Sequence, residues 1–482
     1  MPEAPGAPPA DTTRRYGGNL SLCSLPHRYG TVGSDRWQLR RSARPEGKPR
    51  SAHHRTGDRR QRSTTLITNR IHQRLLAGPP LSGGAEPLDV QSARLGTLPR
   101  GAERDGLIST IEASGLLGRG GAGFPVGRKW RALADRRYGS AVVVVNGAEG
   151  EPASAKDRTL MAYRPHLVVD GAILAAEAVG ADEIVFYVGQ EHGAAVAAIR
   201  RAVDERRREI GLPTRLVRAP VGYVAGEASA AVHFINDGDA RPTTTPPRVS
   251  ELGVNGRPTL VQNVESLAYA ALIARFGDHW YRSAGRFDSP GTALVTVTGG
   301  VREPGVREIE LGQTAGEVAV AAGADPTRIR AFVLGGYFGT WARTSDAWSL
   351  PLDPAVMRDH GLTFGCGIVG LLPDDRCGVL ATAEIMAFMA RESAGQCGPC
   401  VFGLRAIGES TRKVAQGEAD TDEVRDLERW ASQLPGRGAC HHPDGAIQLL
   451  VSALDVFGDE FTVHARTGRC SVTGSPVRAA VG

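Results

Sequence analysis

Apolar runs and segments of helical periodicity alternate between residues 106 and 290. Two runs, AVVVVNG at 141–147 and EIVFYVG at 183–189, are rich in β-branched residues and end in glycine, which is typical of strands buried on both faces. Helical spacing predicts helices at 65–78, 105–117, 166–181 and 192–209. Strands that alternate with helices in this way predict a largely parallel α/β domain over 106–290.

The pattern changes near residue 290. Residues 292–301 (TALVTVTGGV) alternate at period two, 302–323 predict a turn, a short strand and a helix, and 331–341 predict another strand. This β–β–α–β order is typical of a small β-grasp module, which we place at 291–370.

From residue 380 onward the spacing is helical again. Helices are predicted at 380–393, 402–417, 422–434 and 444–461. They predict a C-terminal helical bundle over 371–465, followed by a tail over 466–482.

Charge is distributed unevenly along the chain. Residues 1–64 hold thirteen Lys and Arg against five Asp and Glu, which leaves 44 against 47 in the other residues. A segment rich in Pro, Arg, Gly and Ser buries too little apolar surface to fold, so we expect a disordered basic tail at 1–64, then a helix and linker at 65–105. The alternative for the tail is a tether to nucleic acid or to an acidic partner, but no nucleic acid is expected at the folded part.

The location is predicted from two further patterns. The first thirty residues lack the features of a secretory signal, and no apolar run reaches the ~18–20 residues that a membrane helix requires. We therefore expect a cytoplasmic protein without a membrane span. Seven cysteines, an odd number, argue against a disulfide framework.

The densest candidate site is the glycine-rich stretch GLLGRGGAGFPVGRKW at 115–130. It is neither a Walker loop nor a dinucleotide-binding loop that follows a strand. Its glycines allow the backbone to approach a ligand closely, and Arg119, Arg128 and Lys129 can meet a phosphate. A plain glycine-rich connector is the alternative.

Polar side chains follow the predicted strand at 141–147. Asn146, Glu149 and Glu151 come directly after its valines, and ligands gather at the carboxyl ends of strands in open α/β sheets. Such side chains can hydrogen-bond a polyol chain, an isoalloxazine edge or a nicotinamide amide, although a solvated acidic turn is the alternative. Glu227 in GYVAGEASA lies at a predicted strand–helix junction, and PTLVQNVESLA at 258–268 adds Asn263.

Three cysteines form a candidate metal set. Cys397 and Cys400 stand three apart in ESAGQCGPC at 392–400, and Cys440 lies forty residues beyond in GACHHP. Three-residue spacing is typical of iron–sulfur ligands. The other cysteines are scattered along the sequence and are predicted to be ordinary thiols: Cys23, Cys366, Cys377 and Cys470.

Taken in order, the motifs resemble a known family. GRGGAGFP followed by KW, N-x-x-E-x-E-P followed by KDR, Y-x-x-GE, P-T-x-V-x-N-V-E and E-S-x-G-x-C-x-P-C are similar to those of the flavin-bearing, NADH-oxidising subunit of respiratory complex I. Related subunits occur in NAD-reducing hydrogenases and formate dehydrogenases. The resemblance covers about residues 106–460. It implies an FMN- and NADH-binding α/β domain, a β-grasp module that resembles soluble-ligand-binding ones, and a helical iron–sulfur domain.

The resemblance also implies ligands. The glycine loop would bind FMN, and Asn146 and Asn263 would hold its ribityl chain and phosphate. Glu149, Glu151 and Glu227 would be the catalytic carboxylates near the flavin–nicotinamide contact, where hydride transfer needs positioning rather than a tuned acid. The implied cofactor-binding residues are Gly118, Arg119, Gly120, Gly121, Phe124, Lys129, Asn146, Glu149, Glu151, Glu227 and Asn263.

Three positions in the flavin half depart from the family pattern. Ala148 stands where the family has Asp, Ala132 where it has an aromatic residue, and Arg248 where Phe is usual. A stacked aromatic contact contributes roughly 0.5–1.5 kcal/mol, so we expect weakened NADH binding. Arg248 could stack on adenine or meet a phosphate, which leaves NADPH open as the substrate.

The metal motif departs as well. The family pattern of three spaced cysteines and a distant fourth binds a [4Fe–4S] cluster. Here Cys397, Cys400 and Cys440 are the implied ligands, and Ala394 replaces the remaining cysteine. A [4Fe–4S] cluster completed by histidine, the Ser393 hydroxyl or water, a [3Fe–4S] cluster, a zinc site, and no metal all stay open.

The sequence thus predicts an FMN-dependent NADH dehydrogenase subunit, an oxidoreductase that passes a hydride from NADH to FMN and then single electrons through the cluster. The expected acceptor is a thioredoxin-like [2Fe–2S] subunit, a ferredoxin, or a membrane complex to which the chain is peripheral. The rival hypothesis is a non-catalytic subunit that keeps the fold with a degraded cluster and a weakened NADH site.

Overall fold

A computed structural model describes residues 73–101, 104–136, 139–286 and 288–477. The predicted basic tail at 1–64, Cys23 within it, and the first eight residues of the predicted helix at 65–78 lie outside the described residues.

Residues 73–78 do not form the predicted end of that helix. The backbone amides of Arg74, Leu75 and Leu76 donate at 2.9–3.0 Å to the buried carboxylate of Glu308. A helix would need these amides for its own carbonyls, and here a side chain takes them. The helix prediction is therefore wrong for the described residues, because a distant carboxylate holds this segment.

The first sheet has four strands, all parallel, in the order β3-β2-β1-β4. They are β1 (Ala141–Gly147), β2 (Ala181–Gly189), β3 (Thr214–Ala219) and β4 (Thr259–Asn263). The two predicted buried runs are β1 and β2, so the prediction of a parallel sheet is confirmed. Val143 and Val145 pack into one hydrophobic cluster, and Val142 and Val144 pack into another. Both faces of the sheet are therefore covered.

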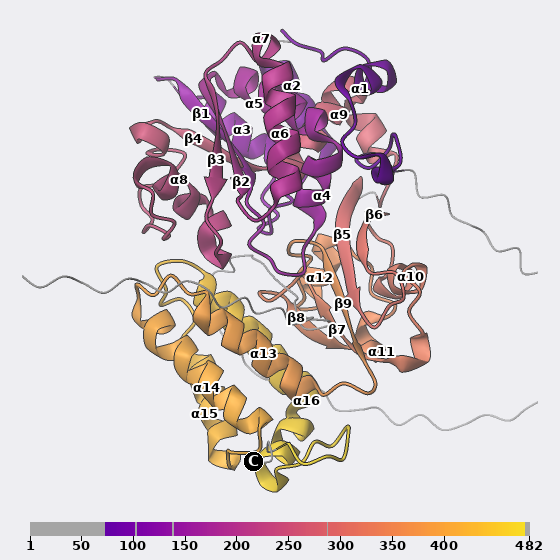
Figure 1. Ribbon diagram of the computed structural model, residues 1–482, viewed down its shortest axis with the longest axis vertical. Coiled ribbons are helices and arrows are strands. Elements are labelled where there is room, and N and C mark those ends of the chain that lie inside the picture. Colours follow the sequence, from indigo (N-terminus) through magenta and orange to yellow (C-terminus); the bar gives the residue numbers. More distant parts are fainter. Residues whose placement is uncertain (1–72, 102–103, 137–138, 287, 478–482) are drawn as a thin grey trace, which may run out of the picture.

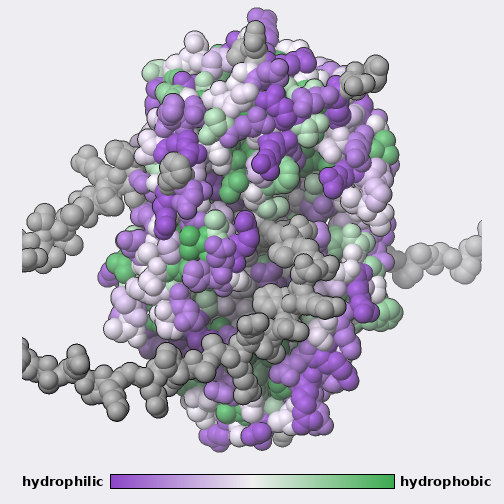
Figure 2. Space-filling model, turned by 180° about the vertical axis from the view of Figure 1, so that it is seen from behind, coloured by the Kyte–Doolittle hydropathy of each residue, from purple (hydrophilic) through white to green (hydrophobic). Residues whose placement is uncertain are grey.

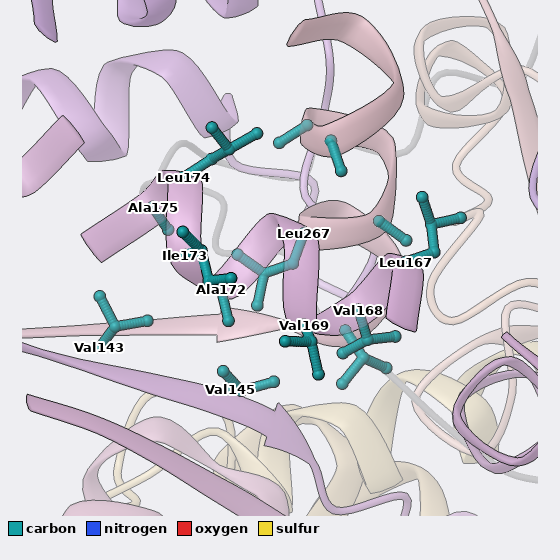
Figure 3. Packing of buried hydrophobic residues seen from close by; sticks show 14 of the residues in the cluster. Val143, Val145, Leu167, Val168, Val169, Ala172, Ile173, Leu174, Ala175 and Leu267 are labelled. Atoms are coloured by element: carbon teal, nitrogen blue, oxygen red, sulfur yellow. The ribbon is translucent and has the colours of Figure 1, made fainter. Parts of the chain in front are cut away.

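Helices cover the two faces of this sheet (Figure 1). On one face lie α5 (Pro165–Val179) and α9 (Val264–Arg282). Figure 3 shows Val143 and Val145 of β1 close to side chains of α5 and to Leu267 of α9. The opposite face is covered by α8 (Ala228–Asp237). The other helices of this part are α1 (Leu88–Leu95), α2 (Arg104–Ser114), α3 (Val126–Ala134), α4 (Lys156–Tyr163), α6 (Gly193–Glu205) and α7 (Arg207–Ile210).

The helices predicted for this part are present. Those at 105–117, 166–181 and 192–209 correspond to α2, α5, and α6 with α7. α2 ends three residues early, because Gly115 adopts a φ of 74° that a helix does not allow.

The second sheet has five strands in the order β6-β5-β9-β7-β8, with β5 and β9 parallel and the other neighbours antiparallel. Its strands are β5 (Thr292–Gly299), β6 (Gly305–Glu310), β7 (Ile329–Leu334), β8 (Thr340–Arg343) and β9 (Ile368–Pro373). Its helices are α10 (Ala315–Ala321), α11 (Thr344–Ala347) and α12 (Pro354–Asp359).

The predicted β–β–α–β order is present as β5, β6, α10 and β7, and the β-grasp assignment stays a prediction. The predicted strand at 331–341 is wrong in one respect, since it is two strands, β7 and β8. Gly335 and Gly336 adopt φ angles of 81° and 112° and turn the chain between them. The central strand β9 was not predicted from the sequence.

The C-terminal part is helical, as predicted. It contains α13 (Gly378–Arg391), the π-helical η5 (Pro399–Leu404), α14 (Arg405–Ala415), α15 (Thr421–Gln433) and α16 (His442–Thr467). The short 3-10 helices of the chain are η1 (Leu81–Gly83), η2 (Tyr223–Gly226), η3 (Val254–Gly256) and η4 (Pro326–Arg328). α16 is longer than the predicted 444–461 at both ends and is kinked at Phe457.

In Figure 1 the parallel α/β part occupies the upper half, and the second sheet and the helices α13–α16 lie below it. Figure 2 shows hydrophilic residues interspersed with small hydrophobic patches on the rear face. Among the described residues, no helix has the length and apolar character needed to cross a membrane.

Candidate cofactor site

A cavity of about 640 Å³ lies where the parallel sheet meets the helical part. Its wall combines the glycine-rich loop, the turn after β1, the start of α8, the end of β4 and residues 438–441. Ten of the eleven predicted cofactor-binding residues line it, Gly121 being the exception, and Cys440 lines it as well. A second cavity of about 770 Å³, between α1 and the start of α5, contains none of the predicted site residues.

Two asparagines reach the cavity from neighbouring strands. Asn146 is the last but one residue of β1, Asn263 is the last of β4, and the two are partners in the parallel register. The Asn146 amide donates to the Gly226 carbonyl at 2.9 Å, and the Asn263 amide donates to Asp157 at 2.8 Å. Both side chains are thus held in place at the carboxyl edge of the sheet, where ligands of such sheets bind.

The glycine-rich loop is closed at its base. The Gly118 amide donates to the Phe124 carbonyl at 2.9 Å, and the Val126 amide to the Leu116 carbonyl at 3.0 Å. A Cβ added at Gly120 would lie 3.3 Å from Cβ of Asn263. The loop backbone therefore lies so close to the end of β4 that a side chain at this position would make a tight contact.

Arg119 anchors this loop from within. Its guanidinium is buried and donates to the Tyr281 hydroxyl at 3.1 Å and to the Thr292 carbonyl at 3.0 Å. Its Nε lies 3.7 Å from a carboxylate oxygen of Glu265. The charged group therefore ties the loop to α9 and β5, and its predicted cofactor contact stays a prediction.

Two lysines in the cavity wall differ in their partners. Lys156 contacts Asp157 at 2.8 Å and Glu265 at 2.9 Å. Lys129 of α3 donates to the Val261 carbonyl at 2.5 Å, and burial lowers its pKa to about 8. Carboxylates offset the charge of Lys156, whereas Lys129 faces a neutral carbonyl. A bound anion would therefore stabilise the charge of Lys129 more than that of Lys156.

Two of the three predicted catalytic carboxylates accept hydrogen bonds from backbone amides at the starts of helices. Glu149 accepts from the Asp157 amide at 3.1 Å and the Arg158 amide at 3.2 Å, at the start of α4. Glu227 is the N-cap of α8 and accepts from the Ser229 and Ala230 amides at 2.8 and 3.0 Å. These hydrogen bonds fix both side chains at the helix starts, beside the cavity.

Glu151 has different surroundings. It is only 8% exposed, and one of its oxygens accepts from the Cys366 thiol at 3.3 Å. Its other oxygen is buried and has no hydrogen-bond partner in the described part of the chain. Burial raises the pKa of Glu151 well above its ordinary value, against the opposing effects of Cys366 and Lys156. Glu151 can therefore carry a proton and donate it in a hydrogen bond to a ligand.

The predicted aromatic residue and the three positions that depart from the family pattern differ in whether they line the cavity. Phe124 lines the cavity and is 56% exposed, which makes its ring available to a ligand. Ala148 lines the cavity, whereas Ala132 and Arg248 are exposed and are not part of its wall.

Of the three predicted metal ligands, Cys440 lines the cavity, together with His441. Cys397 lies in the turn before η5, and Cys400 lies within η5. This turn is attached to the α/β part, because the Gln396 amide donates to the Pro242 carbonyl at 2.6 Å. Ala394 packs against the same hydrophobic cluster as Cys400.

Of the two histidines beside Cys440, His442 is buried and its Nε2 donates to the Met389 carbonyl at 2.8 Å. Its ring also makes an edge contact with Tyr223 of the cavity wall, at 5.3 Å between centroids. His441 is half exposed and contacts Asp444 at 3.1 Å. His441 is therefore the histidine that faces the cavity, and His442 packs inside the bundle.

Sequence reasoning missed several residues. Cys366 was expected to be an ordinary thiol, yet it lines the cavity and contacts Glu151. Cys377 and Cys470 were also predicted to be ordinary thiols, yet their sulfurs lie together with the His464 ring. No spacing signal could reveal these contacts, since the partners are far apart in the sequence.

Comparison with known proteins gives two family matches. Residues 111–271 match the family described as the Nuo51 FMN-binding domain, and residues 380–464 match the NADH-ubiquinone oxidoreductase-F iron-sulfur binding region.

Individual relatives extend the match over most of the chain. An F subunit of the NADH-quinone oxidoreductase of Rhizobium meliloti is 30% identical over 76% of this chain and 90% of that protein. The corresponding F subunit of Escherichia coli is 32% identical over 75% of this chain and 84% of that protein. A crystal structure of an NAD⁺-reducing [NiFe]-hydrogenase in the H₂-reduced state matches with a TM-score of 0.70 and 29% identity, over 76% of this chain. The match spans 63% of that hydrogenase chain, which is less than two thirds of its length.

Proposed function

This chain belongs to the family of NADH-quinone oxidoreductase F subunits, and from that premise we propose that it is the subunit through which electrons from NADH enter a larger complex. It is an oxidoreductase subunit with an FMN-binding domain over 111–271 and an iron–sulfur binding region over 380–464. When bound, FMN accepts a hydride and releases its electrons one at a time.

One observation carries the proposal. The cavity that holds ten predicted cofactor-binding residues is also lined by Cys440, one of three predicted cluster ligands. A two-electron cofactor in this cavity would therefore lie next to a one-electron metal site, as the proposed electron transfer requires.

The cavity wall fits FMN. The Gly118–Gly121 backbone would hold the flavin where a side chain at Gly120 would meet Asn263. The amides of Asn146 and Asn263 would hydrogen-bond the ribityl hydroxyls, and Lys129 would meet the phosphate. Arg119 would act by holding the loop in place, since its guanidinium binds Tyr281 and Thr292.

The carboxylates would position the nicotinamide. Burial raises the pKa of Glu151, and in its protonated form it would donate a hydrogen bond through the oxygen that lacks a partner in the described part of the chain. Glu149 and Glu227 would accept from amide or hydroxyl groups of the dinucleotide, and Phe124 would pack on a ring at the opening. Hydride transfer depends on this positioning and not on a general acid.

At the metal site, Cys397, Cys400 and Cys440 would hold the cluster. Three thiolates suit a [3Fe–4S] cluster, or a [4Fe–4S] cluster whose fourth iron takes water, the Ser393 hydroxyl or the cavity-facing His441. Ala394 supplies no ligand atom.

The finer assignments follow from the same family. We place the flavin domain at 106–290, a β-grasp module at 291–370 and the iron–sulfur domain at 371–465. The parallel pair of β5 and β9 in a mixed sheet supports the β-grasp assignment. The acceptor would be a thioredoxin-like [2Fe–2S] subunit or a ferredoxin, and the location cytoplasmic.

The test uses the full chain purified without oxygen and supplemented with FMN. We expect about one FMN per chain, with flavin absorbance that bleaches when NADH is added, and iron in the same preparation. Lys129→Met should raise the Kd for FMN about 10- to 100-fold, since a hydrogen bond to a charged group contributes about 1.5–3 kcal/mol. Arg128→Met is the control: the sequence made Arg128 a phosphate candidate too, but it is exposed and does not line the cavity, so the Kd should stay unchanged.

A protein that stays colourless after FMN supplementation would contradict the function. A protein that binds FMN but does not bleach with NADH or NADPH would favour the rival, a non-catalytic subunit that keeps the fold.

A further inference from the structure

A second group of metal-ligand side chains lies at the far end of the helical bundle. Cys377 is the N-cap of α13, His464 lies in the last turn of α16, and Cys470 follows in the C-terminal loop. Their ligand atoms all lie within 4.8 Å of one another. All three are buried, with exposures of 5%, 0% and 2%.

This group is separate from the cluster cysteines. Cys377 directly precedes α13 and Cys397 follows the end of this helix, so the fourteen residues of α13 lie between the two cysteines. At 1.5 Å per residue, the helix separates the two sites by about 20 Å. In Figure 1 the C-terminal end lies at the bottom of the bundle, away from the α/β part.

The histidine is oriented as a metal ligand. Its Nδ1 lies 3.2 Å from the Ala415 carbonyl, at the end of α14. A carbonyl only accepts, so Nδ1 carries the proton and Nε2 presents its lone pair. Nε2 lies 3.3 Å from the Cys377 sulfur. Histidine ligands usually donate their other ring N–H to such an oxygen, which sets the tautomer.

Both sulfurs face backbone donors. The Leu380 amide donates to the Cys377 sulfur at 3.5 Å, at the start of α13. The amides of Val472 and Thr473 face the Cys470 sulfur. Hydrogen-bond donors around a ligand atom fix its orientation toward a metal.

The loop that carries Cys470 is shaped by hydrogen bonds of its own backbone. The Cys470 amide donates to the Ser475 carbonyl at 2.9 Å, and the Gly474 amide donates back to the Cys470 carbonyl at 2.8 Å. The Val477 amide donates to the Gly468 carbonyl at 3.0 Å. The backbone of this loop therefore places Cys470 beside the end of α16.

We propose that Cys377, His464 and Cys470 bind one zinc ion that joins the C-terminal loop to the ends of α13 and α16. Two sulfurs and one imidazole are ligands that zinc accepts in a tetrahedral site. No fourth His, Cys, Asp or Glu belongs to the group among the described residues, so a water completes the tetrahedron. As the two Zn–S bonds form, the two thiol protons pass to solvent. Zinc does not change oxidation state, so the site supports the bundle and stands outside the electron path.

The test measures metals in the full chain, purified under reducing conditions. We expect about one zinc per chain, with X-ray absorption showing two sulfurs at about 2.3 Å and nitrogen or oxygen at about 2.0–2.1 Å. Cys377→Ser and Cys470→Ser should each lower zinc at least about fivefold, because each removes a thiolate ligand. Cys397→Ser is the matched control from the cluster motif and should keep its zinc while losing iron.

A measurement on the unmodified chain covers the case in which these variants fail to fold. Removing zinc with a chelator should speed proteolysis within 468–477 at least about threefold, and zinc addition should restore resistance, because the ion holds this loop.

Three results would overturn the proposal. The first is a wild-type chain that holds no zinc after purification in zinc-supplemented buffer. The second is zinc that is lost in Cys397→Ser but kept in Cys470→Ser. The third is a disulfide between Cys377 and Cys470 under reducing conditions.

Discussion

At the residue scale, the three glutamates of the cavity wall differ in their hydrogen-bond partners, because each has different neighbours. Glu149 and Glu227 accept hydrogen bonds from backbone amides at helix starts, which fix their positions. Glu151 faces the Cys366 thiol and a buried interior. The sequence shows three glutamates near glycine-rich turns and does not distinguish them; the surrounding donors do.

We expect Glu151→Gln to raise the free energy of unfolding near pH 8 and to leave it nearly unchanged near pH 4. Burial raises the pKa of folded Glu151 above 4.5. As the pH rises above that value, the unfolded chain releases its proton first, so stability is lost until the pH passes the folded pKa. Glutamine has no such proton to release, so the variant avoids this loss of stability. The loss amounts to about 1.4 kcal/mol for each unit by which folding raises the pKa. Urea unfolding of the flavin-free protein from pH 4 to 8 measures the difference.

Glu227→Gln serves as the control, because it weakens a helix cap and should lower stability at pH 8. Equal stability of Glu151→Gln and wild type at every pH would show that Glu151 is ionised in the folded protein.

At the element scale, two helices cross over the sheet without intervening side chains. A Cβ added at Gly171 of α5 would lie 2.1 Å from the carbonyl oxygen of Leu267 in α9. The helices therefore meet at backbone distance, and nearly all of α5 is buried. Because α9 follows β4 directly, this crossing also sets the position of Asn263 at the cavity.

We expect Gly171→Ala to lower the free energy of unfolding by about 2–3 kcal/mol, because the added methyl forces the two helices apart. Gly106→Ala in α2 is the control: its Cβ would enter open space, and alanine is favoured over glycine in helices by about 0.5–1 kcal/mol. Denaturant unfolding of both variants measures the effect. A Gly171→Ala protein as stable as wild type would mean that α5 and α9 do not meet at backbone distance.

At the scale of the whole molecule, the cavity joins parts distant in sequence. The glycine loop and the turn after β1 form one wall, Cys366 comes from the segment before β9, and residues 438–441 come from the helical part. A cofactor bound there would contact all of them and hold the α/β part against the bundle.

We expect FMN binding to slow amide hydrogen exchange in residues 436–442 as well as in 118–129, because both segments line one cavity. Residues 468–477, in the C-terminal loop, should be unaffected. Mass spectrometry of exchange with and without FMN measures this. Protection confined to 118–129 would show that the helical part does not contact the bound flavin.

The sequence by itself determined the elements and the motifs. The valine run at 142–145 predicted a buried strand, helical spacing predicted the C-terminal helices, and the motif order identified the family. Ten predicted cofactor residues do meet in one cavity. These features depend on short-range periodicity and on residue types at fixed spacing, which a chain shows before it folds.

Only the tertiary structure decided how distant residues pair. In the folded chain the Arg119 guanidinium donates to Tyr281, and the amides of residues 74–76 donate to Glu308. The predicted strand at 331–341 forms two strands. The tertiary structure also brought Cys377, His464 and Cys470 together. Such contacts follow from the packing of whole helices and sheets, so no local pattern in the sequence contains them.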